Sequence, residues 1–187
     1  MQINYYRVRC SKLAPILLLH ATKQPRNTLV PECYKTQVNA FYQLELNDLY
    51  AILRLRQDVF IDEQQSIYND IDNFDQSSLH ICIYCEGELV AYARVREAKV
   101  SELAKIERVV CTKSHRGKGL GATLIRESLE LIKDRFSCVD VMLSAQTVAS
   151  DFYLQFGFHV QGLPYDDGGI EHIDMHLAQQ RGLNSVN

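Results

Sequence analysis

Apolar and polar residues alternate along seven short segments of the chain, a pattern typical of β-strands. These segments are residues 38–44, 79–85, 88–95, 105–111, 139–145, 158–162 and 172–177. Two other segments, residues 45–60 and 122–136, repeat their apolar residues every three or four positions and predict amphipathic helices. A shorter helix is predicted over residues 147–156, with Thr147 as N-cap and Gly157 at its end. This order of elements predicts a mixed α/β domain.

The first predicted helix carries a cation on its apolar face. Asn47 is the predicted N-cap, and Arg56 falls on the same track as Ile52 and Phe60. A buried guanidinium needs a carboxylate or carbonyl partner, because an unpaired buried charge costs several kcal/mol. In the alternative arrangement, only the aliphatic stem of Arg56 packs against the core and its charged group reaches water.

The chain divides into three parts. Residues 1–37 lack a sustained period and contain three prolines, so we predict an N-terminal extension that is poorly ordered or loosely packed. The domain is predicted over residues 38–180, followed by a short tail over residues 181–187. Residues 13–19 are apolar but too short to span a membrane. They resemble a secretion signal only weakly, since Ala21 is the one small residue of a poor cleavage pattern.

Composition and charge narrow the class of protein. The chain of 187 residues has a formal net charge of −3, so it has no basic field that would attract nucleic acid or an anionic membrane. Its six cysteines show no disulfide spacing, which favours a cytoplasmic protein. Cys82 and Cys85 form a C-x-x-C within a predicted strand, where their side chains point to opposite faces. Neither they nor the six histidines predict a metal site.

The segment "RGKGLG" combines three glycines and two cations at the start of the second predicted helix. The first N–H groups of a helix have no intrahelical partner, and the helix dipole makes that end positive. Glycine allows a ligand to approach the backbone closely. Arg116 and Lys118 add charge to this position. The segment therefore predicts a binding site for phosphate, most simply a diphosphate.

The spacing of the segment excludes two common phosphate loops. No Ser or Thr follows Lys118, as a P-loop requires, and G-x-G-x-G is not the dinucleotide fingerprint. Together with "ASDFYLQFGF", the segment "VVCTKSHRGKGLGATLI" resembles the GNAT superfamily of acyl-CoA-dependent N-acetyltransferases. "LRQDVFIDEQ", "YNDIDNFD" and "GGIEHIDMHL" are similar to its ElaA-type branch, although Glu107 and Glu171 stand where that branch commonly has glycine and proline. The resemblance implies a single mixed, mostly antiparallel, splayed sheet flanked by helices.

The resemblance also implies roles for the donor side of the site. The loop formed by Arg116, Gly117, Lys118, Gly119, Leu120 and Gly121 would hold the pyrophosphate of acetyl-CoA. Backbone N–H groups of Val109, Val110 and Cys111 would lie in the gap where the sheet splays and stabilise an oxyanion. Tyr153 matches the family tyrosine that faces the thioester sulfur, with an aromatic core position beside Phe152 and Phe156 as the alternative. Gln146 stands where relatives often bind the pantetheine arm through asparagine.

Acids near the predicted gap are candidates for the acceptor side. A general base must deprotonate the amine, and Glu107 is the nearest acid, with a salt bridge, for example to Arg108, as its alternative role. Glu63 is the second candidate. The acidic segment 62–75, which includes Asp72, would attract a cationic amine or else form a solvated loop. Arg56 and His80 complete the predicted substrate-binding set, with a core position as the alternative for His80.

These observations predict an N-acetyltransferase that moves an acetyl group from acetyl-CoA to a primary amine through a direct tetrahedral intermediate. The acceptor is expected to be a small molecule or a peptide, and the resemblance makes a homodimer plausible. Two alternatives remain open at this point: an acyl-homoserine-lactone synthase-like enzyme, and an acyl-CoA sensor without catalytic activity. The R-G-x-G-x-G loop argues against the synthase, which normally lacks it.

Overall fold

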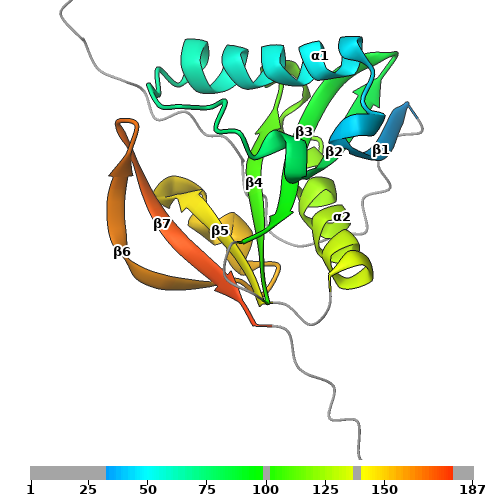
Figure 1. Ribbon diagram of the computed structural model, residues 1–187. Helices are drawn as coiled ribbons and strands as arrows, with labels where there is room; N and C mark the ends of the chain where they lie inside the picture. Colours follow the sequence, from blue (N-terminus) through cyan, green and yellow to red (C-terminus); the bar gives the residue numbers. More distant parts are fainter. Residues whose placement is uncertain (1–32, 99–101, 137–139, 179–187) are drawn as a thin grey trace, which may run out of the picture.

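The computed structural model describes residues 33–98, 102–136 and 140–178. The predicted tail and most of the predicted N-terminal extension lie outside these residues. The described chain forms a seven-stranded sheet in the order β1-β2-β3-β4-β5-β7-β6, in which only β4 and β5 are parallel neighbours. The mixed, mostly antiparallel sheet flanked by helices is therefore confirmed (Figure 1).

The strands are β1 (Tyr34–Ala40), β2 (Leu79–Cys85), β3 (Glu88–Glu97), β4 (Leu103–Cys111), β5 (Asp140–Gln146), β6 (His159–Asp167) and β7 (Ile170–Leu177). The α-helices are α1 (Leu46–Arg56), α2 (Leu120–Arg135) and α3 (Ser150–Leu154). A π-helical segment, η2 (Gln57–Glu63), continues α1, and short 3₁₀ turns are η1 (Phe41–Gln43), η3 (Asp75–Ser77), η4 (Lys113–His115) and η5 (Thr147–Ala149).

The sheet splays between β4 and β5. Only Leu103–Lys105 of β4 pair with Asp140–Met142 of β5, although both strands continue well beyond that contact. Figure 1 shows the two strands diverging from this shared end, so that β1–β4 form one half of the sheet and β5–β7 the other. The backbone edge of β4 beyond Lys105 is thus left without a partner strand on the β5 side, as the family resemblance implied.

A β-bulge lies at the same point of β4. The register moves from the pair Arg94–Glu107 to the pair Tyr92–Val110, so β4 has one residue more than β3 between these pairs. Arg108 has a φ of 56°, a left-handed conformation that non-glycine residues rarely adopt. The bulge therefore changes the direction of the β4 backbone where the sheet opens.

Alternation along the strands places two apolar cores on opposite faces of the sheet. On one face, Ile52, Leu55 and Val59 of α1 and η2 pack with Cys82 and Tyr92. On the other face, the apolar stripe of α2 packs against the neighbouring strand positions, including Ile81 and Ile83. Because successive strand residues point to opposite faces, Cys82 lies in one core and its neighbours in the other.

Local sequence signals predicted most elements but misplaced some ends. Glu86 and Gly87 have φ values of 52° and 87°, which confirms the predicted tight hairpin between β2 and β3. The predicted first strand over residues 38–44 starts earlier, at Tyr34, and ends at Ala40. Residues 34–37 therefore pair with β2. α1 begins one residue after Glu45, so Asn47 lies inside the helix and is not its N-cap.

Candidate functional site

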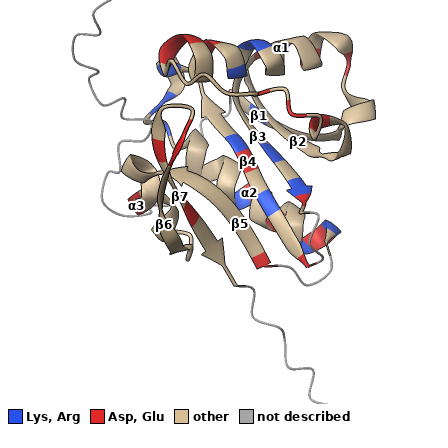
Figure 2. Ribbon diagram, turned by 60° about the vertical axis from the view of Figure 1, so that its left-hand side comes forward, with Lys and Arg blue, Asp and Glu red and all other residues tan. Residues whose placement is uncertain are grey.

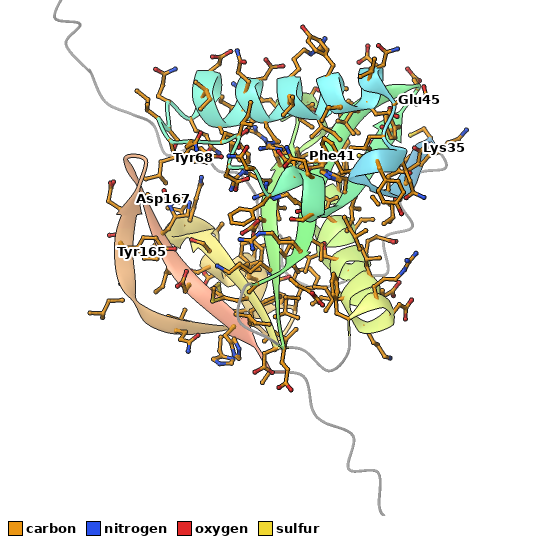
Figure 3. All side chains as sticks on the ribbon, in the orientation of Figure 1. Lys35, Phe41, Glu45, Tyr68, Tyr165 and Asp167 are labelled. Atoms are coloured by element: carbon orange, nitrogen blue, oxygen red, sulfur yellow. The ribbon has the colours of Figure 1, made fainter. Side chains whose placement is uncertain are left out.

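A cavity of about 350 Å³ lies where the two halves of the sheet separate. Its walls come from the bulged part of β4, the head of α2, the end of η2 with the loop that follows, and the β5–β7–β6 half of the sheet. Figure 3 labels Tyr68 on one of these walls and Tyr165 and Asp167 on the other. Several predicted site residues meet here: Glu107, Val109, Val110, Cys111, Gly121, Gln146 and Tyr153 all line the cavity.

The head of α2 is open to an anion. Gly117 and Gly119 have φ values of 74° and 84°, a conformation that glycine adopts without strain. Within the described residues, no protein group accepts a hydrogen bond from the N–H groups of residues 117–122. Gly121 lines the cavity, and Lys118 is exposed beside it. The loop therefore presents unpaired donors and the positive end of a helix dipole toward the cavity.

Arg116 is already engaged by protein groups. Its Nη1 and Nη2 donate to the two carboxylate oxygens of Glu63 at 2.6 and 2.8 Å, and its Nε donates to the Cys111 carbonyl at 3.1 Å. The hydrogen bond from Arg116 holds the pKa of Glu63 below its ordinary value. These contacts argue against direct phosphate binding by Arg116 and against Glu63 as a base or amine ligand. The pair instead fastens η2 to the end of β4.

The end of β4 lies along the cavity with its backbone. Val109, Val110 and Cys111 are among the lining residues, in the stretch that has no β5 partner. The Cys111 thiol donates a hydrogen bond to the Thr112 carbonyl at 3.6 Å, and burial raises the pKa of this thiol to about 11. Because the thiolate is the reactive form, Cys111 is a poor nucleophile at neutral pH.

Tyr153 lies between the apolar core and the cavity. Its ring makes edge-to-face contacts with Phe152 and Phe158, with centroid distances of 5.0 and 6.3 Å, and its residue surface is 7% exposed. Burial raises the pKa of Tyr153 to about 12. No described residue hydrogen-bonds its hydroxyl. The packing fixes the ring, and the hydroxyl is left for a ligand.

Two glutamine side chains bridge the cavity. Gln146 Nε2 donates to Gln64 Oε1 at 3.0 Å, linking the end of β5 to the residue after η2. Gln64 is only 7% exposed, and its Nε2 is a buried donor without a hydrogen-bond partner among the described residues. A buried unpaired amide N–H costs about 1–3 kcal/mol. Gln64 therefore provides a vacant donor for a ligand oxygen in this cavity.

The family model described as "Acetyltransferase (GNAT) domain" matches residues 42–179. The chain belongs to the GNAT acetyltransferase family. It is 37% identical to protein ElaA of Escherichia coli over 136 residues, 71% of this chain and 89% of that protein. It is also 37% identical to the UPF0039 protein sll0451 of Synechocystis over 130 residues, 68% of this chain and 84% of that protein.

Solved structures agree with this assignment. The crystal structure of E. coli ElaA has a TM-score of 0.73 at 34% identity and covers 77% of this chain and 99% of its own. An acyl-CoA N-acyltransferase from Pseudomonas aeruginosa has a TM-score of 0.74 at 31% identity and covers 78% and 99%. A Bacillus subtilis acetyltransferase solved in complex with CoA shares the fold, with a TM-score of 0.57 at 13% identity. The resemblance to the ElaA-type GNAT branch is confirmed.

The acidic segment of this GNAT domain is neutralised by arginines. Four carboxylates, from Asp70, Asp72, Asp75 and Glu107, form ion pairs with four arginines. These arginines are Arg56, Arg94, Arg96 and Arg108. Figure 2 shows the basic and acidic positions side by side on β3 and β4. Since Arg116 also binds Glu63, four of the five acids in segment 62–75 are paired with arginines and do not supply the free negative field that the sequence analysis expected for a cationic amine.

Glu107 belongs to this network. Its Oε2 accepts hydrogen bonds from Arg94 at 2.7 Å and Arg96 at 2.8 Å, and its Oε1 accepts one from Arg96 at 2.7 Å. Burial alone would raise its pKa, but the two arginines outweigh burial and lower it. A carboxylate held this firmly in its ionised form is a poor proton acceptor. These contacts argue against Glu107 as the general base, and its partners are not Arg108 as the sequence suggested.

Three other predicted substrate ligands lie outside the cavity lining. Arg56 is fully buried and donates hydrogen bonds to Asp70 and Asp75, which confirms that its guanidinium points inward and is paired. It does not line the cavity, so nothing supports a role in substrate binding. Asp72 is bound by Arg94 and Arg108. His80 is fully buried between the Asp75 carbonyl at 3.0 Å and the Tyr92 hydroxyl at 2.8 Å, and burial lowers its pKa. His80 is thus a satisfied core histidine.

The sequence analysis missed a second group of polar residues. Ser144, Tyr165, Asp167, His172 and Asp174 line the cavity from β5, β6 and β7, and Gln64 lines it from the end of η2. The alternation of "HIDMHL" already placed His172 and Asp174 on one face of a strand, but only the register shows that this face meets the cavity. Within the described ranges, no cluster of His, Cys, Asp or Glu is arranged to hold a metal, and no helix is long and apolar enough to cross a membrane.

Proposed function

We propose that this protein is an N-acetyltransferase that transfers an acetyl group from acetyl-CoA to a primary amine by direct attack. The observation that carries the proposal is the row of unpaired backbone N–H groups at residues 117–122, of which Gly121 lines the cavity in the splayed sheet. A diphosphate satisfies these donors and the helix dipole together. The B. subtilis acetyltransferase with this fold was solved in complex with CoA, which supports the same donor here.

The thioester arm extends from α2 along β4 toward Tyr153. The vacant Gln64 Nε2, positioned by Gln146, donates to a carbonyl oxygen of the pantetheine arm. Those N–H groups of residues 109–111 that point to the open β5 side stabilise the oxyanion that forms when the amine attacks the acetyl carbonyl. Lys118 adds a charge at the phosphates, while Arg116 shapes the loop through Glu63.

Tyr153 stabilises the leaving sulfur through a hydrogen bond. Burial raises its pKa to about 12, whereas a thiol ordinarily titrates near 8.5. Complete proton transfer from the phenol to the thiolate therefore costs about 5 kcal/mol, at 1.36 kcal/mol per pKa unit. A hydrogen bond that strengthens as negative charge develops on sulfur avoids this cost. The proton that finally neutralises the thiolate then comes from the attacking amine, by way of the hydroxyl.

An acyl-enzyme route through Cys111 is disfavoured. Its thiol is hydrogen-bonded to the Thr112 carbonyl and its pKa of about 11 leaves little thiolate at neutral pH. Direct transfer requires both substrates to be bound at once, in a ternary complex, which predicts intersecting rather than parallel double-reciprocal plots.

Calorimetry with two donors tests the proposal. Acetyl-CoA should bind, and S-acetylpantetheine, which lacks the diphosphate, should bind at least tenfold more weakly. The Lys118→Gln variant should weaken acetyl-CoA binding a few-fold and leave acetylpantetheine unaffected. Equal binding of the two donors would contradict the diphosphate site. Tight acetyl-CoA binding without release of free thiol on any primary amine would instead identify an acyl-CoA sensor.

A further inference from the structure

One wall of the cavity carries polar groups that the donor chemistry does not use. In the antiparallel ladder between β5 and β7, Ser144 pairs with Asp174 and Gln146 pairs with His172, and on the other side of β7 His172 pairs with Tyr165. Directly opposed residues of such a ladder project to the same face, with Cβ atoms about 5 Å apart. His172 therefore lies directly beside Gln146, which reaches Gln64 and the proposed thioester arm.

His172 presents a free lone pair to the cavity. Its Nδ1 lies 2.8 Å from the Ile170 carbonyl oxygen. A carbonyl can only accept, so Nδ1 carries the hydrogen and Nε2 is the unprotonated nitrogen of the neutral ring. No described residue donates to Nε2. An imidazole nitrogen with a free lone pair can accept a proton.

Two carboxylates on the same wall lack basic partners. Asp167 and Asp174 line the cavity, and neither forms an ion pair with any described Lys, Arg or His. Tyr165 donates to Asp174 at 2.8 Å and also contacts Ser144. Burial raises the pKa of Tyr165, and the neighbouring Asp174 adds to this effect, so the phenol remains a donor. This wall therefore has the negative charge that the neutralised segment 62–75 lacks.

The carboxylates are not equivalent in position. Asp174 is two residues from His172 on the same face of β7, about 7 Å along the strand. Asp167 ends β6 at the hairpin, and Figure 3 shows it nearer to the tip and to Tyr68 than Tyr165 is. Lys105 is a cation of the lining without an ion pair in the described residues, and it lies on β4 at the closed end of the splay. Asp174 thus lies close to His172, whereas Asp167 lies near the hairpin tip.

We propose that the β5–β7–β6 wall is the acceptor site, that it selects a primary alkylamine carrying a second positive charge, and that His172 Nε2 is the general base. This inference rests on the proposed acyl transfer. Asp174 holds the reacting ammonium beside His172, and Asp167 holds the distal cation of a diamine or polyamine. The unpartnered Nε2 of His172 on the same wall is the sign, separate from the two carboxylates, that a ligand completes this site.

The chemical step is balanced as follows. One ammonium proton moves to His172 Nε2, and the N–H electron pair remains on nitrogen. This pair forms the C–N bond as the carbonyl π pair moves to oxygen. The oxyanion then collapses, the C–S bond breaks, and a second amine proton reaches sulfur through the Tyr153 hydroxyl. The products are the N-acetylamine and CoA thiol, and His172 releases its proton to solvent.

The role of His172 is tested by measuring the release of free thiol with two acceptors, pentylamine and 2,2-difluoropentylamine. His172→Gln should lower kcat with pentylamine about 100-fold or more, the usual contribution of a general base. The same substitution should lower kcat far less with 2,2-difluoropentylamine, because the fluorines make this amine less basic and it is already largely unprotonated in solution. Added imidazole should partly restore His172→Ala. The matched control is His159→Gln, on exposed β6 outside the cavity lining, which should retain wild-type activity.

The charge preference of the acceptor site is tested with cadaverine, pentylamine and 5-aminopentanoate. All three are primary amines with a five-carbon chain, and the end opposite the amine is positive, neutral and negative, respectively. Wild-type kcat/KM should fall in that order. Asp167→Asn should reduce the preference for cadaverine over pentylamine at least fivefold. Asp174→Asn should raise KM for all three. Equal kcat/KM for the three acceptors would overturn the charge assignment, and full activity of His172→Gln would overturn the base.

These outcomes remain distinct from failure of the proposed function. If wild-type protein binds no acetyl-CoA, or releases no thiol with any primary amine, both the acyl transfer and the acceptor site are refuted. If it acetylates other primary amines but none of these three, only the acceptor site is refuted. If wild-type protein turns over but the His172 and Asp variants match it, only the acceptor site is refuted. Calorimetry must also show unchanged acetyl-CoA binding by His172→Gln, since loss of donor binding would assign His172 to the donor side.

Discussion

Replacing Tyr153 by phenylalanine removes one hydroxyl and little else. The ring packs against Phe152 and Phe158, and phenylalanine preserves those contacts. The hydroxyl has no hydrogen-bond partner among the described residues, so its removal breaks no protein contact there. We therefore expect the melting temperature and the acetyl-CoA dissociation constant to remain close to wild type.

The catalytic effect follows from the charge on the leaving sulfur. A hydrogen bond to a charged group contributes about 1.5–3 kcal/mol. Since each 1.36 kcal/mol changes a rate tenfold, Tyr153→Phe should lower kcat about 10- to 150-fold. A full proton-transfer role would give a larger loss that varies steeply with the pKa of the leaving thiol. Because burial raises the pKa of Tyr153 to about 12, its protonated form should persist and wild-type kcat should show no loss from tyrosine ionisation below pH 10.

The assay follows free thiol at saturating acetyl-CoA, with cadaverine as acceptor, alongside thermal melts and calorimetry. Tyr84→Phe is the matched control, because its hydroxyl donates to Asp48 at 2.9 Å away from the cavity lining. That control should lose about 1 kcal/mol of stability and keep its activity. An unchanged kcat for Tyr153→Phe would refute the role assigned to the phenol, and so would a loss explained entirely by unfolding or by weaker acetyl-CoA binding.

Three further substitutions address the supporting structure. Glu107→Gln should lower the free energy of unfolding in urea by up to about 3 kcal/mol, because Arg94 and Arg96 lose their carboxylate partner. Its kcat should stay within a few-fold of wild type. If Glu107 were the general base, kcat would instead fall about 100-fold at unchanged stability. Since the folded-state pKa of Glu107 is lowered, its contribution is present above the ordinary value of 4.5 and is lost as pH falls through the folded pKa, so Glu107→Gln should flatten that acid slope. Cys111→Ser should retain activity. Iodoacetamide should label wild-type Cys111 slowly at pH 7.5, because burial raises the pKa of its thiol to about 11. A burst of thiol release from acetyl-CoA alone would show an acyl-enzyme and contradict direct transfer. Gly168→Ala should destabilise the β6–β7 hairpin tip by about 1–2 kcal/mol and raise the KM for the acceptor. Gly168 has a φ of 62°, and a Cβ at this position would lie 2.5 Å from Ser66 Oγ. Unchanged hydrogen exchange at this hairpin would contradict the expected destabilisation.

The donor half of the site could be predicted because its signals are local. A glycine-rich turn before an amphipathic helix determines both the backbone conformation and the helix start, so residues 117–121 predicted an anion site without any tertiary information. Cys111 and Tyr153 were placed by short motifs of the GNAT family. The structure puts both beside the cavity. Their roles in the reaction stay predictions until the kinetics are measured.

The acceptor half could not be predicted in the same way. The sequence shows five acids in residues 62–75 and several arginines elsewhere, but it does not show which will meet. Arg116 and Glu63 are 53 positions apart, and Arg94 and Asp72 are 22 apart. Glu107 looked like a free acid near the gap because its two arginine partners lie on the neighbouring strand.

The sequence by itself determined the alternation that makes the strands, the glycine turn that starts α2, and hence the family and the proposed donor site. Those properties depend on φ angles and periods within a few residues of one another. Tertiary structure alone decided which charges cancel and which remain available. Strand register and the splay between β4 and β5 bring remote side chains together. They pair four of the five acids of segment 62–75 with arginines and leave His172, Asp167 and Asp174 to line the cavity.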